Sequence, residues 1–247
     1  MKEAFNFMFK DNMFLKKAMV YVFVAFVANL VSNYANTLAP MPKTMPSIQY
    51  ILFFLAGAIL MLIPSGYGVS CIKAFVEQKD NFVIPFLNIK NNFVLGFKLA
   101  VSIIIMSLIF GLCITIAAMA FAFLFSLINA VTIGSIILGV FVCTIILIVV
   151  FYSLAFCYIF ATTEKLTSFI QFRTATKLIK NNPKHYILST LVFIGLSLLV
   201  GVAGTIITSV LNSYGFIGLA IATFIIVSIS GYTVYVYSYL TSKAIQA

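Results

Sequence analysis

Residues able to carry acid–base, nucleophilic or metal chemistry are few in this sequence and lie far apart. There is one histidine, His185, and there are five acidic residues: Glu3, Asp11, Glu77, Asp80 and Glu164. They form no HExxH motif, no Ser–His–Asp set and no phosphate-binding loop. The four cysteines form no CxxC pair and accompany no histidine cluster. We therefore expect no catalytic residue, no metal site and no cofactor, in a protein that is not an enzyme.

The segment Gly66-Tyr67-Gly68 resembles part of a potassium-channel filter, but its context argues against that function. Pro64 and Ser65 precede it where the filter has Thr-Val, and no short pore helix comes before it. A proline and two glycines near the end of an apolar run are typical of a bent helix. Pro64, Gly66 and Gly68 therefore predict a kink that turns the chain at the end of a membrane span.

The composition excludes the water-soluble classes of protein. Of 247 residues, 63% are hydrophobic and 8% are charged, whereas soluble domains have about 45–50% and about 25%. A soluble enzyme, a disordered chain and a nucleic-acid-binding domain are excluded, so the net charge of +10 predicts no nucleic-acid partner. Apolar runs of about 20 residues predict membrane-spanning helices. We expect an all-α helix bundle, one polytopic membrane domain over 1–247, with six transmembrane helices at 18–38, 47–70, 98–127, 134–161, 187–211 and 215–240.

The distribution of basic residues predicts the orientation of these spans. If there are six spans, 14 of the 15 Lys and Arg residues fall on one side of the membrane, and only Lys43 falls on the other. Cytoplasmic segments of membrane proteins carry an excess of Lys and Arg. We therefore expect a multi-pass protein of the plasma (inner) membrane with both termini in the cytoplasm.

The connections after the second and fourth spans predict amphipathic cytoplasmic helices. In the fourth connection, basic residues recur at helical spacing on one face, and Phe172, Ala175, Leu178 and Ile179 occupy the other. One interpretation is a helix packed on the bundle with a solvated basic face. The other is an interfacial helix that binds anionic lipid headgroups. In that case the headgroup ligands are Arg173, Lys177, Lys180 and Lys184.

Two segments separated by ninety residues share a pattern of identities. Ile89-Lys90-Asn91-Asn92 recurs as Ile179-Lys180-Asn181-Asn182, and small residues recur at the same offset. A parallel internal repeat is one explanation, and convergence of similar membrane hairpins is the other. Small residues spaced four apart let helix backbones approach closely. We therefore predict helix packing at two ridges, Ser107, Gly111 and Thr115, and Ser197, Gly201 and Thr205.

Four short motifs resemble those of a known protein family. They are Phe9-Lys10-Asp11 followed by Leu15-Lys16-Lys17 before the first span, Pro64 with Gly66-Tyr67, Pro85 followed by Gly96-Phe97-Lys98, and Thr162-Thr163-Glu164-Lys165. Together they resemble a family of uncharacterised prokaryotic integral membrane proteins, defined only as a domain of unknown function. Phe14 stands where that family usually has Trp. The resemblance implies a six-helix bacterial or archaeal membrane protein and supplies no catalytic residues.

The absence of catalytic motifs favours a structural, assembly or partner subunit of an envelope system. Its expected partners are the lipid bilayer, including anionic lipids, and other membrane proteins. The alternative is a transporter or the permease subunit of a transport complex, which the repeat would favour. A third hypothesis, a lipid-acting enzyme at the cytoplasmic face, depends only on the basic helix. Proton and ion paths require ionisable residues inside the membrane. No acidic residue falls inside a predicted span.

Overall fold

The computed structural model describes residues 11, 13–37, 47–77, 83–127 and 131–246. They form helices and no strand: α2 (Phe14–Thr37), α3 (Ile48–Glu77), α4 (Ile89–Leu127), α5 (Val131–Thr163), α6 (Phe172–Asn181), α7 (Pro183–Leu211) and α8 (Gly215–Gln246). All except α6 are long and apolar enough to span a membrane. The six predicted spans are therefore confirmed, although α3 and α4 extend well past their predicted inner ends.

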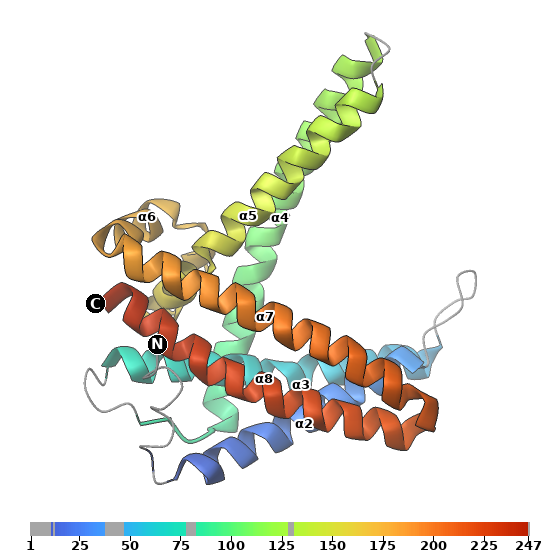
Figure 1. The fold of residues 1–247 in the computed structure, drawn as a ribbon, viewed down its shortest axis with the longest axis vertical. Helices are drawn as coiled ribbons and strands as arrows, with labels where there is room; N and C mark the ends of the chain where they lie inside the picture. The colour runs from blue at the N-terminus through green and yellow to red at the C-terminus, as the bar shows by residue number, and fades with distance from the viewer. Residues whose placement is uncertain (1–10, 12, 38–46, 78–82, 128–130, 247) are drawn as a thin grey trace.

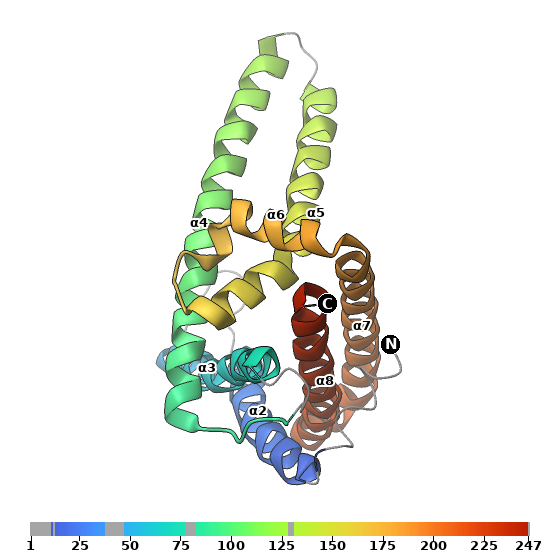
Figure 2. The same ribbon diagram turned by 90° about the vertical axis from the view of Figure 1, so that its left-hand side faces the viewer.

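The helices form two groups (Figures 1 and 2). Helices α2, α3, α7 and α8 run alongside one another. Helices α4 and α5 pair into a hairpin that crosses this group steeply and leaves it. With 39 residues, α4 is about 58 Å long at 1.5 Å per residue, against about 30 Å for the hydrocarbon layer. A helix this long fits a bilayer only if it tilts or extends beyond it.

Residues 103–126 and 132–148, which we call the projecting hairpin, lie almost entirely on the surface. Large apolar side chains on all sides of it are exposed, among them Ile104, Leu112 and Leu147. In the most apolar stretch of each helix, only 6% of α4 and of α5 is buried, against 28% of α8. Such helices are stable in lipid, where apolar surface needs no cover.

A side chain from α7 explains why the hairpin leaves the bundle. The hydroxyl of Tyr186 donates to the Phe151 carbonyl oxygen at 2.6 Å and accepts from the Ala155 N–H at 3.3 Å. It thus inserts between two backbone groups that would bond each other in a regular α-helix. Such an insertion bends a helix, and α5 changes direction near this point (Figure 2).

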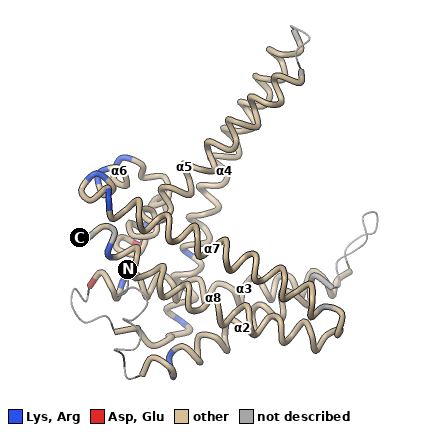
Figure 3. Tube along the Cα trace, viewed as in Figure 1, with Lys and Arg blue, Asp and Glu red and all other residues tan. Residues whose placement is uncertain are grey.

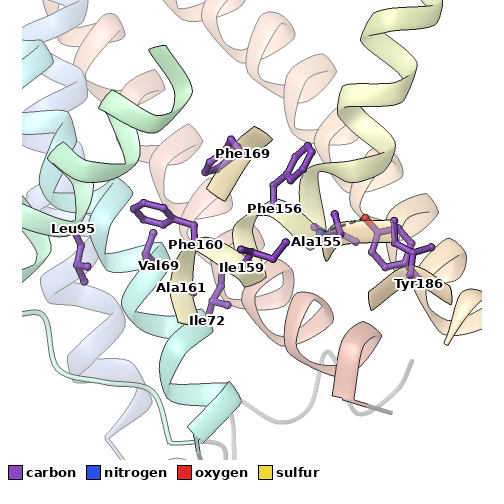
Figure 4. Close-up of a cluster of buried hydrophobic side chains, with 13 residues drawn as sticks. Val69, Ile72, Leu95, Ala155, Phe156, Ile159, Phe160, Ala161, Phe169 and Tyr186 are labelled. Atoms are coloured by element: carbon purple, nitrogen blue, oxygen red, sulfur yellow. Dashed lines mark hydrogen bonds between the residues drawn. The ribbon is translucent and has the colours of Figure 1, made fainter. Parts of the chain in front are cut away.

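The buried core lies towards one end of the molecule. Rings of Tyr21, Tyr67 and Tyr235 contact one another with centroids 5.1–6.2 Å apart. A second cluster joins α5 to α3, α4 and α7 and includes Phe156 and Tyr186 (Figure 4). The start of α2, the end of α8 and the described Lys and Arg residues also lie towards this end (Figure 3). We call it the basic end.

The two predicted amphipathic connections differ. The fourth connection contains α6, as predicted. In the second, residues 83–88 are not helical and α4 begins directly at Ile89, so the separate helix that we predicted does not exist among the described residues of this connection. Hydrogen bonds to Asp11 and from Tyr67 of α3, described below, hold this segment instead.

The repeated tetrapeptides occupy different structures. Ile89–Asn92 begins α4, whereas residues 179–182 end α6 and lead into α7. The helix contacts differ as well, because Gly66 and Gly96 meet between α3 and α4 while the residues ninety positions later are Phe156 and Tyr186. The local packing of the two units is therefore not the same.

Candidate functional site

Glu164 joins three helices at the basic end. It follows α5, and its Oε1 and Oε2 accept hydrogen bonds from the ammonium groups of Lys73 in α3 and Lys98 in α4, each at 3.0 Å. Hydrogen bonds from Lys98 and Lys73 lower the pKa of Glu164 below its ordinary value. The backbone of Glu164 is left-handed, with φ of 50°, which costs a non-glycine residue about 1–2 kcal/mol. The carboxylate therefore holds a position that the backbone alone disfavours.

A buried ion pair fixes the start of α2. Asp11 Oδ2 lies 2.7 Å from Lys17 Nζ, and both side chains are almost fully buried. Asp11 also accepts hydrogen bonds from the N–H groups of Met13 and Ile84. Burial alone would raise the pKa of Asp11, but the bonds from Lys17 and Met13 outweigh it and lower the pKa below its usual value. The pair ties the extended segment 83–88 to α2.

The same segment is held from α3. The Tyr67 hydroxyl donates to the Pro85 carbonyl oxygen at 2.9 Å. The Lys17 ammonium lies 4.8 Å from the centre of the Phe86 ring, within cation–π range. Segment 83–88 is therefore bound on both sides, which explains how it is ordered without being helical.

Helices α3 and α4 touch backbone to backbone. A Cβ atom added to Gly66 would collide with the Asn92 carbonyl oxygen, and one added to Gly96 would collide with the Leu62 carbonyl oxygen. Asn92 is buried, and its side-chain oxygen accepts a hydrogen bond from Ser70 at 2.7 Å. Only glycine allows this approach.

The four motifs on which the family resemblance depended all contribute to this region. Asp11, Tyr67, Lys98 and Glu164 come from the four different motifs, and each makes one of the contacts described above. Phe9 and Lys10 lie outside the described residues. We call this set of contacts the basic-end junction. Among the described residues, it is built from ion pairs, hydrogen bonds and close packing.

The kink predicted in α3 stays a prediction. Pro64, Gly66 and Gly68 lie within α3, which continues to Glu77, so they do not mark its end. Neighbouring helices enclose this part of α3: Pro64 and Gly66 are buried, and a Cβ atom added to Gly68 would lie 3.6 Å from Val234 of α8. Gly66 therefore serves close helix contact.

The two predicted packing ridges make no close helix contact within this chain, so that prediction is wrong for the chain by itself. All six residues are exposed: Ser107, Gly111, Thr115, Ser197, Gly201 and Thr205. A Cβ atom on Gly111 or Gly201 would meet nothing within 4 Å. Thr115 and Thr205 satisfy their hydroxyl groups on carbonyl oxygens of their own helices. Small residues at this spacing permit a contact, but they do not determine which face receives a neighbour.

The contacts that do require small residues are at positions the sequence analysis did not assign to packing. They include Gly66 and Gly96, described above, and Gly57, where a Cβ atom would collide with Ser32 of α2. Gly66 begins a run of three small residues spaced four apart, with Ser70 and Ala74. This run, and the presence of Gly66 and Gly96 in the motifs of the family resemblance, are signals that could have found the contact.

Helix α6 lies across the basic end with its apolar face against the protein. Phe172 packs edge-to-face on Phe156 of α5, with centroids 5.0 Å apart, and the hydroxyl groups of Thr176 and Tyr152 lie 3.0 Å apart. The four predicted headgroup ligands are exposed: Arg173, Lys177, Lys180 and Lys184. Within the described part of the chain, none of the four lies in an ion pair. The basic face is therefore fixed in direction and available.

Comparison with known proteins gives one match. A family model described as "Protein of unknown function (DUF4013)" matches residues 50–209, from α3 to α7. No curated protein and no solved structure matches the chain. The match includes Glu164, Lys98 and α6, and it leaves out α2 and α8.

Proposed function

This chain belongs to the DUF4013 family of proteins of unknown function, and we propose that it is a non-enzymatic membrane subunit whose projecting hairpin contacts other transmembrane helices. The plasma membrane is the proposed location, with the basic end and both termini in the cytoplasm. The excess of Lys and Arg at that end supports this orientation.

The projecting hairpin is the observation that carries this proposal. Helices α2, α3, α7 and α8 run alongside one another. In the projecting hairpin, Phe110 contacts Phe172 of α6, and beyond it the described residues of α4 and α5 have no helix beside them except each other. In lipid, no hydrophobic force gathers helices, so close contact depends on faces where backbones can approach. Gly111 in α4 and Gly139 in α5 provide such faces, because a Cβ atom on either would meet nothing within 4 Å.

The alternative of a transporter or permease subunit has less support. It depended on a parallel repeat, and the two units are packed differently. A lipid-acting enzyme would need reacting groups at the basic end. Of the described acidic side chains, Asp11 and Glu164 are engaged in ion pairs, and Glu77 lies exposed at the end of α3.

Loss of a complex on alteration of the hairpin tests the proposal. A variant carrying Gly111→Phe and Gly139→Phe blocks both hairpin faces, while Gly201→Phe alters an equally open position on α7. We expect the complex seen on native gels after mild solubilisation to be lost in the first variant and kept in the second. If both variants keep a complex of unchanged size, the hairpin is not the contact surface.

The second proposed contact is between α6 and anionic headgroups. Helix α6 joins the ends of two membrane spans, so its exposed basic face lies at the depth where headgroups begin. Each basic residue near an anionic leaflet contributes about 1 kcal/mol, so the four contribute about 4 kcal/mol at most. These interactions weaken with salt.

Lipid counting on the intact protein tests this contact. Replacement of Lys177 and Lys180 by Gln should lower the number of phosphatidylglycerol molecules retained in native mass spectra, without changing retained phosphatidylcholine. Lys90→Gln, at an exposed position at the start of α4, is the control for lost charge. Equal loss in the control and in the double variant would contradict a specific role for α6.

A further inference from the structure

A cavity of about 370 Å³ lies between α2, α3 and α8 and residues of α4 and α5. It lies in the half of the bundle nearer the basic end. Ser65, on its wall, is exposed, so the cavity reaches the surface of α3. This volume lies within the range of about 300–1,000 Å³ usual for ligand sites.

The lining determines what the cavity can hold. Among its lining residues, all in the described part of the chain, none is charged. Most are aliphatic or aromatic, and the polar groups are neutral: Tyr21, Asn29, Ser65, Cys157, Ser230 and Tyr237. Every one of these residues belongs to a candidate membrane span. An ion or a strongly polar solute would lose its hydration here without a charged partner.

The size of the cavity argues that it is filled. Protein interiors are close-packed, and an unfilled cavity destabilises a fold in proportion to its volume. Water is a poor occupant of an apolar cavity, since each molecule needs two to four polar partners. Hydrocarbon chains are the abundant molecules at this depth of a membrane, and the space holds about twelve groups the size of a water molecule or methylene.

We propose that this cavity binds one hydrocarbon chain of a membrane lipid, which enters from the bilayer beside Ser65. The chain fills the space between Tyr21, Val69 and Val227. This site is separate from the projecting hairpin, so it can exist whether or not the hairpin contacts a partner.

Adjacent residues of α8 provide a matched pair of variants. Ser230 lines the cavity, whereas the side chain of Ile229 is exposed on the outside of the bundle. Ser230→Phe places a ring in the cavity, and Ile229→Phe places the same ring in the surrounding lipid or detergent. If Ser230→Phe does not yield folded protein, Ser230→Leu serves the same purpose with a smaller side chain.

The thermal stability of delipidated protein is measured with and without dioleoyl phosphatidylglycerol or oleic acid. We expect a rise in Tm of several degrees for the wild type and for Ile229→Phe, and a much smaller rise for Ser230→Phe. Without lipid, Ser230→Phe should be at least as stable as the wild type. A rise with oleic acid alone assigns the site to free chains, and a rise with the phospholipid assigns it to intact lipids. Equal rises in all three proteins, or no rise in the wild type, would overturn the proposal.

Discussion

Replacement of Gly66 by alanine isolates the energy of the closest helix contact in the molecule. The new Cβ atom would collide with the Asn92 carbonyl oxygen and lie 2.6 Å from the Gly96 nitrogen. Both obstacles are backbone atoms, so α3 and α4 must separate. Overpacking of this kind costs about 1–3 kcal/mol.

Gly201→Ala is the matched control, because a Cβ atom at that position of α7 meets nothing within 4 Å. Alanine favours a helix over glycine by up to about 1 kcal/mol at either position. Since this gain is common to both variants, their difference reports the packing cost alone. In a protein of this size, 1 kcal/mol shifts Tm by about 2–4 °C.

Thermal unfolding in one detergent is therefore the assay. We expect Gly66→Ala to melt several degrees below Gly201→Ala, and Gly201→Ala to melt at or slightly above the wild type. The reasoning is refuted if the two variants melt at the same temperature, since α3 and α4 would then not be in backbone contact.

Two further variants test the ion pair and the bend. The lowered pKa of Asp11 means that its carboxylate contributes stability above its ordinary pKa of 3.8, and that this contribution is lost as the pH falls through the folded value. Asp11→Asn should therefore lower the free energy of unfolding by about 3–5 kcal/mol at neutral pH, as expected for a broken buried ion pair. The variant should also lose less stability than the wild type as the pH falls. An equal loss at acid pH in both proteins would contradict this. Tyr186→Phe removes the hydroxyl that separates Phe151 from Ala155 and should straighten α5, so the distance between spin labels at Leu112 and Leu199 should change. An identical distance distribution would assign the bend to another cause.

The sequence predicted the spans well because length and hydropathy determine whether a helix can cross a membrane. It also predicted the basic face of α6, because alternation of basic and apolar residues at helical spacing is a local signal. These two predictions require no knowledge of neighbouring helices.

The arrangement of the spans was not predictable in the same way. Helix α4 is apolar on every side, so no stripe indicates which face has a neighbour. Gly66 and Gly111 look equally suited to a contact in the sequence, yet only Gly66 has one. The bend in α5 depends on Tyr186, which reaches it from another helix 31 residues later than Ala155.

Site-directed photo-crosslinking in living cells tests most directly whether the projecting hairpin contacts other transmembrane helices. A photoreactive side chain is placed at Leu112 in α4, at Leu147 in α5 and, as a control, at Leu199 in α7, all of which are more than 60% exposed. Our account predicts adducts between the hairpin positions and one membrane protein, and only lipid adducts at Leu199. The mass of each adduct shows whether the partner is a different protein or a second copy of this chain. If Leu112, Leu147 and their neighbours one helical turn away all give only lipid adducts, the hairpin contacts no protein and the proposed function is wrong.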